Sequence, residues 1–132
     1  MNKNNVLESW SPIDLQSKSL YFVSLLNGQD GLQIHFEMED FDSFVILDFG
    51  YHAIYFQSQD ENGSLRIIDE LGLRSMDGPF YILNNSNLIN MVSHNSYGFI
   101  EKEGLMHFIL FHTDGLLDIL SNKEPKVYFK SL

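Results

Sequence analysis

The sequence contains no cysteine among its 132 residues. This absence excludes disulfides, thiolate nucleophiles, zinc–thiolate sites and iron–sulfur clusters, because each of them requires the cysteine sulfur. The chain also lacks an apolar run of the about 18 residues that a membrane-spanning helix needs. No apolar segment follows Lys3 as a secretory signal would require. We therefore expect a cytoplasmic protein that does not bind a membrane.

Basic residues are scarce, since 8 Lys and Arg stand against 18 Asp and Glu and give a net charge of −10 at pH 7. A small body with this charge repels nucleic acid and anionic lipid, and it attracts cationic partners. We therefore expect no nucleic-acid partner and favour a basic protein partner. The alternative is that the charge only keeps the protein soluble.

Apolar residues are abundant by comparison, at 44% hydrophobic and 14% aromatic. A chain of this length and composition buries enough apolar surface to offset the entropy of ordering, so residues 1–132 are expected to fold as a single domain. Residues 1–19 are mostly polar, and we interpret them as a loosely structured lead-in. Its expected anchors are Trp10, Pro12 and Ile13.

Hydrophobic alternation predicts an antiparallel meander of three or four strands in the first half of the chain. LQIHFEM (32–38) alternates with period 2, and the Asn-Gly and Asp-Gly pairs before it favour a tight turn. The other strands of the meander are expected at 20–26, 44–49 and 51–57. Later strands are expected at 79–83, 107–113 and 126–129, and LLDIL (116–120) is either a strand or a short helical turn.

Two helices are expected between these strands. Leu65, Ile68 and Leu71 recur at helical spacing in LRIIDELG (65–72), with Ser64 as the expected cap and Gly72 as the stop. A second helix begins at an N-cap that is either Asn85 or Ser86 and ends at Gly98. The predicted fold is thus a single α+β domain, a largely antiparallel sheet with two helices packed on it.

The segment EMEDFD (37–42) concentrates acidic side chains at the predicted hairpin tip after LQIHFEM. An EF-hand register beginning at Glu37 fails, because it places Phe41 at a ligand position and Asp42 where the loop needs glycine. An exposed tip also lacks the burial that raises the pKa of a catalytic acid. These acids form either an ordinary solvated turn or a contact loop for a partner. The predicted partner-binding residues are Glu37, Glu39, Asp40, Asp42, Asp60 and Glu61. Consecutive hairpin tips usually alternate ends, which argues against all six sharing one patch.

The remaining sequence offers no catalytic or metal-binding motif. The five histidines form no HExxH or HxH pair, and each is expected to be a partly exposed strand or surface residue rather than a ligand. His107 and His112 lie five residues apart on one predicted strand, so their side chains should point to opposite faces. Neither a GxSxG elbow nor a glycine-rich phosphate loop occurs. We expect no enzyme, no cofactor and no bound metal.

Two stretches, LYFVSLLNGQDGLQIHF and HFILFHTDGLLDILSNKEPKV, resemble a loose group of small bacterial proteins that are often taken to be immunity proteins. The resemblance covers residues 20–128 and transfers no functional residue. It implies a cytosolic protein that binds a cognate toxin domain, possibly a nuclease, and blocks its active site. Carboxylates that mimic phosphate groups would suit a basic toxin cleft.

Two alternatives come from other classes of protein. One is a small-ligand or enzymatic domain with a pocket between the sheet and the helices, which would be lined by residues such as Tyr51, His52, Tyr55 and His107. The other is a structural subunit that dimerises through an exposed strand edge.

Overall fold

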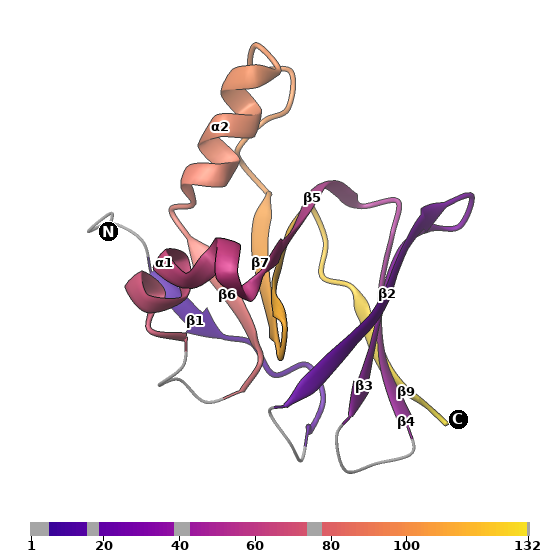
Figure 1. Cartoon of the computed structure of the whole chain (residues 1–132). Helices are drawn as coiled ribbons and strands as arrows, with labels where there is room; N and C mark the ends of the chain where they lie inside the picture. The colour runs from indigo at the N-terminus through magenta and orange to yellow at the C-terminus, as the bar shows by residue number, and fades with distance from the viewer. Residues whose placement is uncertain (1–5, 16–18, 39–42, 74–77, 132) are drawn as a thin grey trace.

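The structure is a computed structural model that describes residues 6–15, 19–38, 43–73 and 78–131. The described chain contains nine strands and two helices (Figure 1). Their bounds are β1 Val6–Ser9, β2 Leu20–Gly28, β3 Gly31–Met38, β4 Ser43–Gly50, β5 Ala53–Asp60, α1 Glu61–Leu71, β6 Phe80–Asn84, α2 Asn87–Asn95, β7 Met106–His112, β8 Gly115–Ser121 and β9 Lys126–Ser131.

The strands form two antiparallel sheets, so the predicted α+β class is confirmed. One sheet has the order β1-β6-β7-β8-β5, and the other has the order β2-β3-β4-β9. The predicted meander therefore ends after three strands. The next strand, β5, leaves it to pair with β8 over residues 53–60, while β9 pairs with β4 in its place.

The two sheets pack face to face, and both helices cover the other face of the five-stranded sheet (Figure 1). Because side chains alternate along a strand, Phe108 and Leu110 of β7 enter the core between the sheets. Ile109, between them, packs with Ile68 of α1. All seven residues of β8 are buried as well, because its two faces pack in different clusters. LLDIL is therefore a central strand covered on both faces, which resolves the predicted ambiguity.

The N-terminal segment differs from its prediction. Val6–Ser9 is not loosely structured but forms β1, which pairs with β6 at the edge of the five-stranded sheet. The polar composition that hid this strand suits its place at the edge, where Glu8 and Ser9 are both exposed. The predicted anchors are confirmed in part, since Trp10 and Ile13 pack on the core and the Trp10 ring lies 4.9 Å from that of Phe108.

The first helix begins earlier than expected. Asp60 rather than Ser64 is its N-cap and accepts the N–H of Gly63 at 2.7 Å. Ser64 lies inside α1, where its hydroxyl donates to the Asp60 carbonyl. Gly72 ends the helix as predicted, with a left-handed φ of 69° that glycine adopts without strain.

The second helix has Ser86 as its N-cap, one of the two predicted residues. Ser96 ends the helix, two residues before the predicted stop at Gly98. The helix projects beyond the end of the sheet (Figure 1). Neither helix of the described chain is long and apolar enough to cross a membrane.

Candidate functional site

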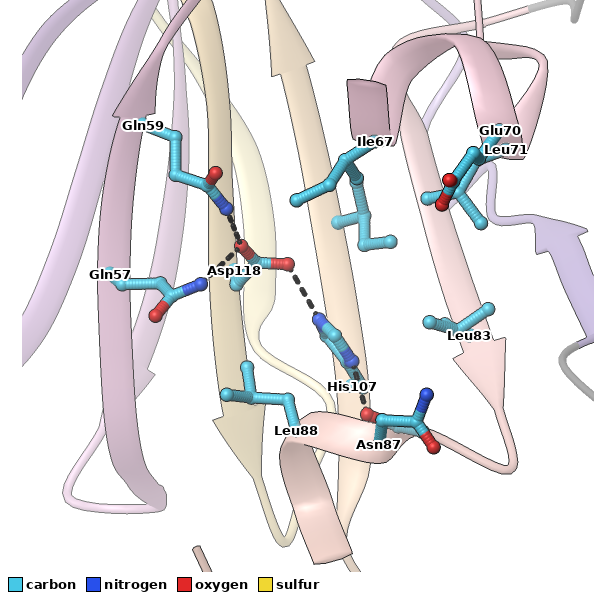
Figure 2. A pocket seen from close by; sticks show the side chains of 12 residues that line it. Gln57, Gln59, Ile67, Glu70, Leu71, Leu83, Asn87, Leu88, His107 and Asp118 are labelled. Atoms are coloured by element: carbon cyan, nitrogen blue, oxygen red, sulfur yellow. Dashed lines mark hydrogen bonds and ion pairs between the residues drawn. The ribbon is translucent and has the colours of Figure 1, made fainter. Parts of the chain in front are cut away.

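A pocket of about 220 Å³ lies on the helix-covered face of the five-stranded sheet (Figure 2). Helix α1 borders it on one side and the start of α2 on the other, and strands β5, β7 and β8 contribute to its wall. Its apolar lining is Ile67, Leu71, Leu83, Leu88 and Ile109, and its polar lining is Gln57, Gln59, Glu70, Ser86, Asn87, His107 and Asp118.

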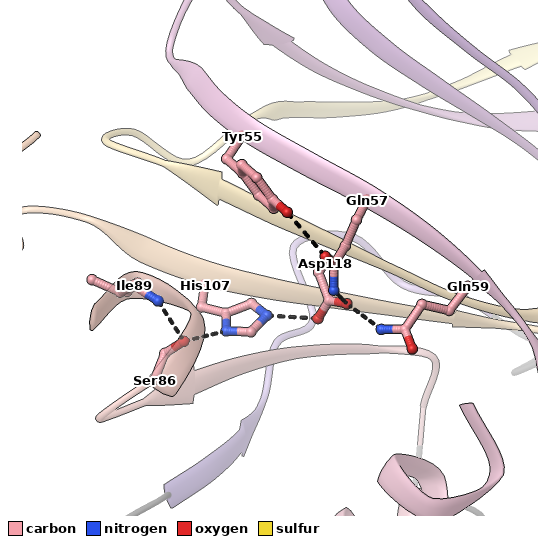
Figure 3. A network of polar contacts seen from close by, with 7 residues as sticks. All are labelled: Tyr55, Gln57, Gln59, Ser86, Ile89, His107 and Asp118. Atoms are coloured by element: carbon pink, nitrogen blue, oxygen red, sulfur yellow. Dashed lines mark hydrogen bonds and ion pairs between the residues drawn. The ribbon is translucent and has the colours of Figure 1, made fainter. Parts of the chain in front are cut away.

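A buried hydrogen-bonded chain runs along the pocket wall (Figure 3). The Ser86 Oγ lies 2.6 Å from the His107 Nδ1, and the His107 Nε2 lies 2.7 Å from the Asp118 Oδ1. The three residues are 3%, 4% and 5% exposed, respectively. This burial removes competing water, and polar groups in such places are nearly always fully paired.

The second carboxylate oxygen of Asp118 is also occupied, because the amides of Gln57 and Gln59 donate to it at 3.0 and 2.9 Å. Burial alone raises the pKa of Asp118. The hydrogen bond from His107, the attraction to His107 and the two glutamine donors outweigh burial and leave this pKa below its usual value. The carboxyl is therefore ionised at neutral pH.

One arrangement of protons, with a neutral His107, satisfies every group in this chain. The Ser86 Oγ accepts the N–H of Ile89 at 3.2 Å as the helix cap, and its hydroxyl donates to the His107 Nδ1. The Nε2 of His107 carries the ring proton in this tautomer and donates to Asp118. In this arrangement each polar group of the Ser86–His107–Asp118 chain has a partner.

Strand register explains how these residues meet. Ile109 pairs with Asp118 across β7 and β8, so His107, two residues earlier on β7, points to the same face and reaches Asp118 diagonally. Gln57 of β5 lies directly opposite Asp118 on its other side. At the end of β6, Asn85 adopts a left-handed φ of 57° and turns the chain so that Ser86 begins α2 above His107.

The histidine prediction is corrected at two positions. His107 and His112 are buried rather than partly exposed, because β7 is covered on both faces. Their predicted opposite orientation is confirmed, since His112 turns toward the intersheet core and packs against the rings of Phe22 and Phe36. Burial lowers the pKa of His112, and Asp114 offsets this only in part. Within the described residues, no three His, Asp or Glu side chains are placed to hold a metal ion.

The predicted acidic surface lies partly within the described chain. Glu37 is exposed near the end of β3 and Asp60 is exposed at the start of α1, where Glu61 follows it half-buried. Glu39, Asp40 and Asp42 lie outside the described residues.

Backbone contacts bring the described parts of this surface to one end of the molecule. Leu20 pairs with Met38 at the end of β3, and the Leu20 carbonyl accepts the N–H of Thr113 at 3.0 Å. The next residue, Asp114, accepts the N–H of Glu61 through its carbonyl at 2.6 Å. The β7–β8 turn therefore links the end of β3 to the start of α1, and it adds the exposed Asp114 to the same end.

Exposed aromatic side chains mark the tip of α2. Tyr97 and Phe99 follow the helix and are 101% and 91% exposed, which is unusual for side chains of this size. Glu101 and Glu103 come next and are also exposed. No sequence motif predicts a role for this aromatic tip.

A pocket between sheet and helices was also predicted, with four lining residues. Of these, His107 lines the pocket, and Tyr55 adjoins it by donating its hydroxyl to Gln57. Tyr51 and His52 lie instead in the exposed β4–β5 turn, beside a separate hollow. Sequence reasoning missed Ser86 and Asp118 as site residues; the available signal was one acid inside the apolar run LLDIL.

The comparisons with known proteins add no relative: no family model, no curated protein and no solved structure matches this chain.

Proposed function

We propose that the protein is a cytosolic immunity-type inhibitor that binds a basic toxin domain and blocks its active site. The observation that carries the proposal is the acidic end of the molecule, which gathers Glu37, Asp60, Glu61 and Asp114. In a chain with a net charge of −10, such a surface attracts a cationic cleft and speeds its encounter.

The geometry favours a protein that blocks the active site of the toxin domain over one that is only attracted to it. The described part of the acidic end lies on two sheets that pack face to face and on a helix that packs on the other face of one of them, so its carboxylates are held on a packed support. A preorganised surface loses little entropy on binding, and this favours a tight complex. Carboxylates at such an end can occupy the places where the basic cleft of a nuclease holds phosphates.

The proposal predicts a gene for a large secreted protein immediately upstream, and the test uses the C-terminal domain of that protein with its active site inactivated so that it can be purified. Its dissociation constant is measured for the wild type and for the double variant Asp40→Lys with Asp42→Lys. The matched control, Glu101→Lys with Glu103→Lys, makes the same charge change beside the aromatic tip. We expect the first pair to weaken binding at least about tenfold and the control pair to change it much less.

Equal effects of the two pairs, or affinity that does not change between low and high salt, would contradict an acidic contact surface. The variant Tyr97→Ala with Phe99→Ala tests the competing surface, because exposed aromatics are the side chains most often found at binding hot spots. If this variant alone loses binding, the contact surface is the aromatic tip and not the acidic end. Failure of the purified proteins to form any complex would remove the proposed function.

A second candidate, an enzymatic domain, is favoured by one observation, the Ser86–His107–Asp118 chain in the pocket wall. It is developed below.

A further inference from the structure

We propose that the pocket between α1 and α2 is a nucleophilic site that hydrolyses small carboxylic esters. Ser86 is the nucleophile, His107 is the general base and Asp118 positions His107. The inference is independent of toxin binding, since the pocket residues do not include the acidic end of the molecule.

The three side chains have the contacts that activate a serine. A serine hydroxyl is a weak nucleophile until a neighbouring base takes its proton and a third group holds that base. Here the Ser86 Oγ is 2.6 Å from the His107 Nδ1, and Asp118 holds the opposite ring nitrogen at 2.7 Å. The His107 ring faces the serine with its Nδ1. Either nitrogen of a neutral imidazole can act as the base, depending on the tautomer. The two glutamines hold Asp118 in turn.

The position of Ser86 at a helix N-terminus stabilises negative charge that develops on a bound substrate. Ser86 caps a helix of nine residues, and the N-terminus of such a helix carries a partial positive charge. An oxyanion that forms beside Ser86 would be stabilised by this charge.

The pocket limits the substrate. Its volume of about 220 Å³ is small, and Leu71, Leu83 and Leu88 supply an apolar wall for a short acyl chain. The Asp118 carboxylate in the pocket wall disfavours an anionic substrate, whereas Glu70 on the rim is paired with Arg66 at 3.1 Å. The favoured class is therefore an uncharged ester with a short acyl group.

The reaction follows from these assignments. The Ser86 Oγ attacks the ester carbonyl carbon as its proton passes to the His107 Nδ1, and Asp118 stabilises the resulting imidazolium. His107 then protonates the leaving alkoxide, so an alcohol departs and an acyl ester remains on Ser86. Water attacks this ester, gives one proton to His107 and releases the carboxylic acid as that proton returns to Ser86. The net reaction is ester plus water to acid plus alcohol.

The test uses the full chain with two probes, a fluorophosphonate and p-nitrophenyl butyrate. We expect one phosphonate adduct, located on Ser86 by mass spectrometry of the digested protein, and ester hydrolysis above the buffer rate. The variant Ser86→Gly should lose both, and circular dichroism checks that it is folded, since glycine is tolerated at an N-cap. Ser58→Ala, at an exposed serine of β5, should keep both.

The two partner residues have their own expected results. His107→Gln should lower kcat about 10²-fold or more, since it removes the general base. Asp118→Asn should lower kcat with little change in KM, because Asp118 positions His107 and the probe ester carries no charge. An unmodified wild type, an adduct at any other residue, or hydrolysis that survives Ser86→Gly would each overturn the site. None of these results bears on whether the protein binds a toxin domain.

Discussion

The substitution Asp118→Ala should destabilise the protein more than any exposed substitution, because it removes the acceptor on which one buried and two half-buried donors converge. The His107 Nε2 and the amides of Gln57 and Gln59 all donate to this carboxylate. Each donor that loses its acceptor costs about 1–3 kcal/mol when water cannot replace it. The adjoining pocket admits water to the glutamines, so the full sum is an upper bound. We expect a loss of about 3–5 kcal/mol in the free energy of unfolding, as for other broken buried pairs.

The assay is urea unfolding followed by circular dichroism, with the free energy of unfolding extrapolated to water. Asp118→Asn keeps one acceptor oxygen and should lose less than Asp118→Ala. Asp69→Ala removes an exposed acid from α1 and should stay within about 0.5 kcal/mol of the wild type. A loss below about 1 kcal/mol in Asp118→Ala would refute the reasoning, since it would mean that the buried carboxylate holds little together.

Three further predictions concern pH and backbone geometry. Because the pKa of Asp118 is lowered in the folded state, its contribution is fully present above the unfolded pKa of about 3.9 and is lost as the pH falls through the folded value. The difference in the free energy of unfolding between the wild type and Asp118→Asn should therefore shrink as urea unfolding is repeated at lower pH. Burial lowers the pKa of His112, so the unfolded state takes up its proton first and stability falls as the pH drops below about 6.5. His112→Phe keeps the ring packing, and thermal unfolding at pH values on both sides of that pKa should show a weaker pH dependence than in the wild type. Gly115→Ala would place a Cβ 1.9 Å from the Gln59 carbonyl oxygen at a φ of 153°, so we expect loss of the folded state by circular dichroism; a native spectrum would contradict the β5–β8 register.

The sequence predicts single elements well because their signals are local. Strand β3 follows from strict alternation, and the end of α1 follows from Gly72. The division into two sheets is different, since it depends on β5 pairing with a strand more than fifty residues away. No local pattern encodes such a partner. The strand β1 is hard to predict for a related reason, because a four-residue edge strand with exposed side chains carries a weak apolar signal.

The candidate site shows the same limit. Ser86 was one of two predicted helix caps, and the opposite orientation of His107 and His112 followed from spacing alone. That Ser86 meets His107, and that both connect to Asp118, depends on the register of β7 and β8 and on the turn at Asn85. These contacts depend on the tertiary fold, which local sequence patterns do not encode. The acidic contact surface stays a prediction, and what the fold adds is the common location of its described residues.

The most direct test of the proposed function is a titration of the active toxin domain with the purified protein. The measured quantity is the residual activity of the toxin domain as a function of the molar ratio. If the protein is an immunity-type inhibitor that blocks the active site, activity should fall linearly and vanish near one equivalent, and the charge reversal at Asp40 and Asp42 should displace the curve to higher ratios. Toxin activity that persists in the presence of a large excess of the wild-type protein would contradict the proposal.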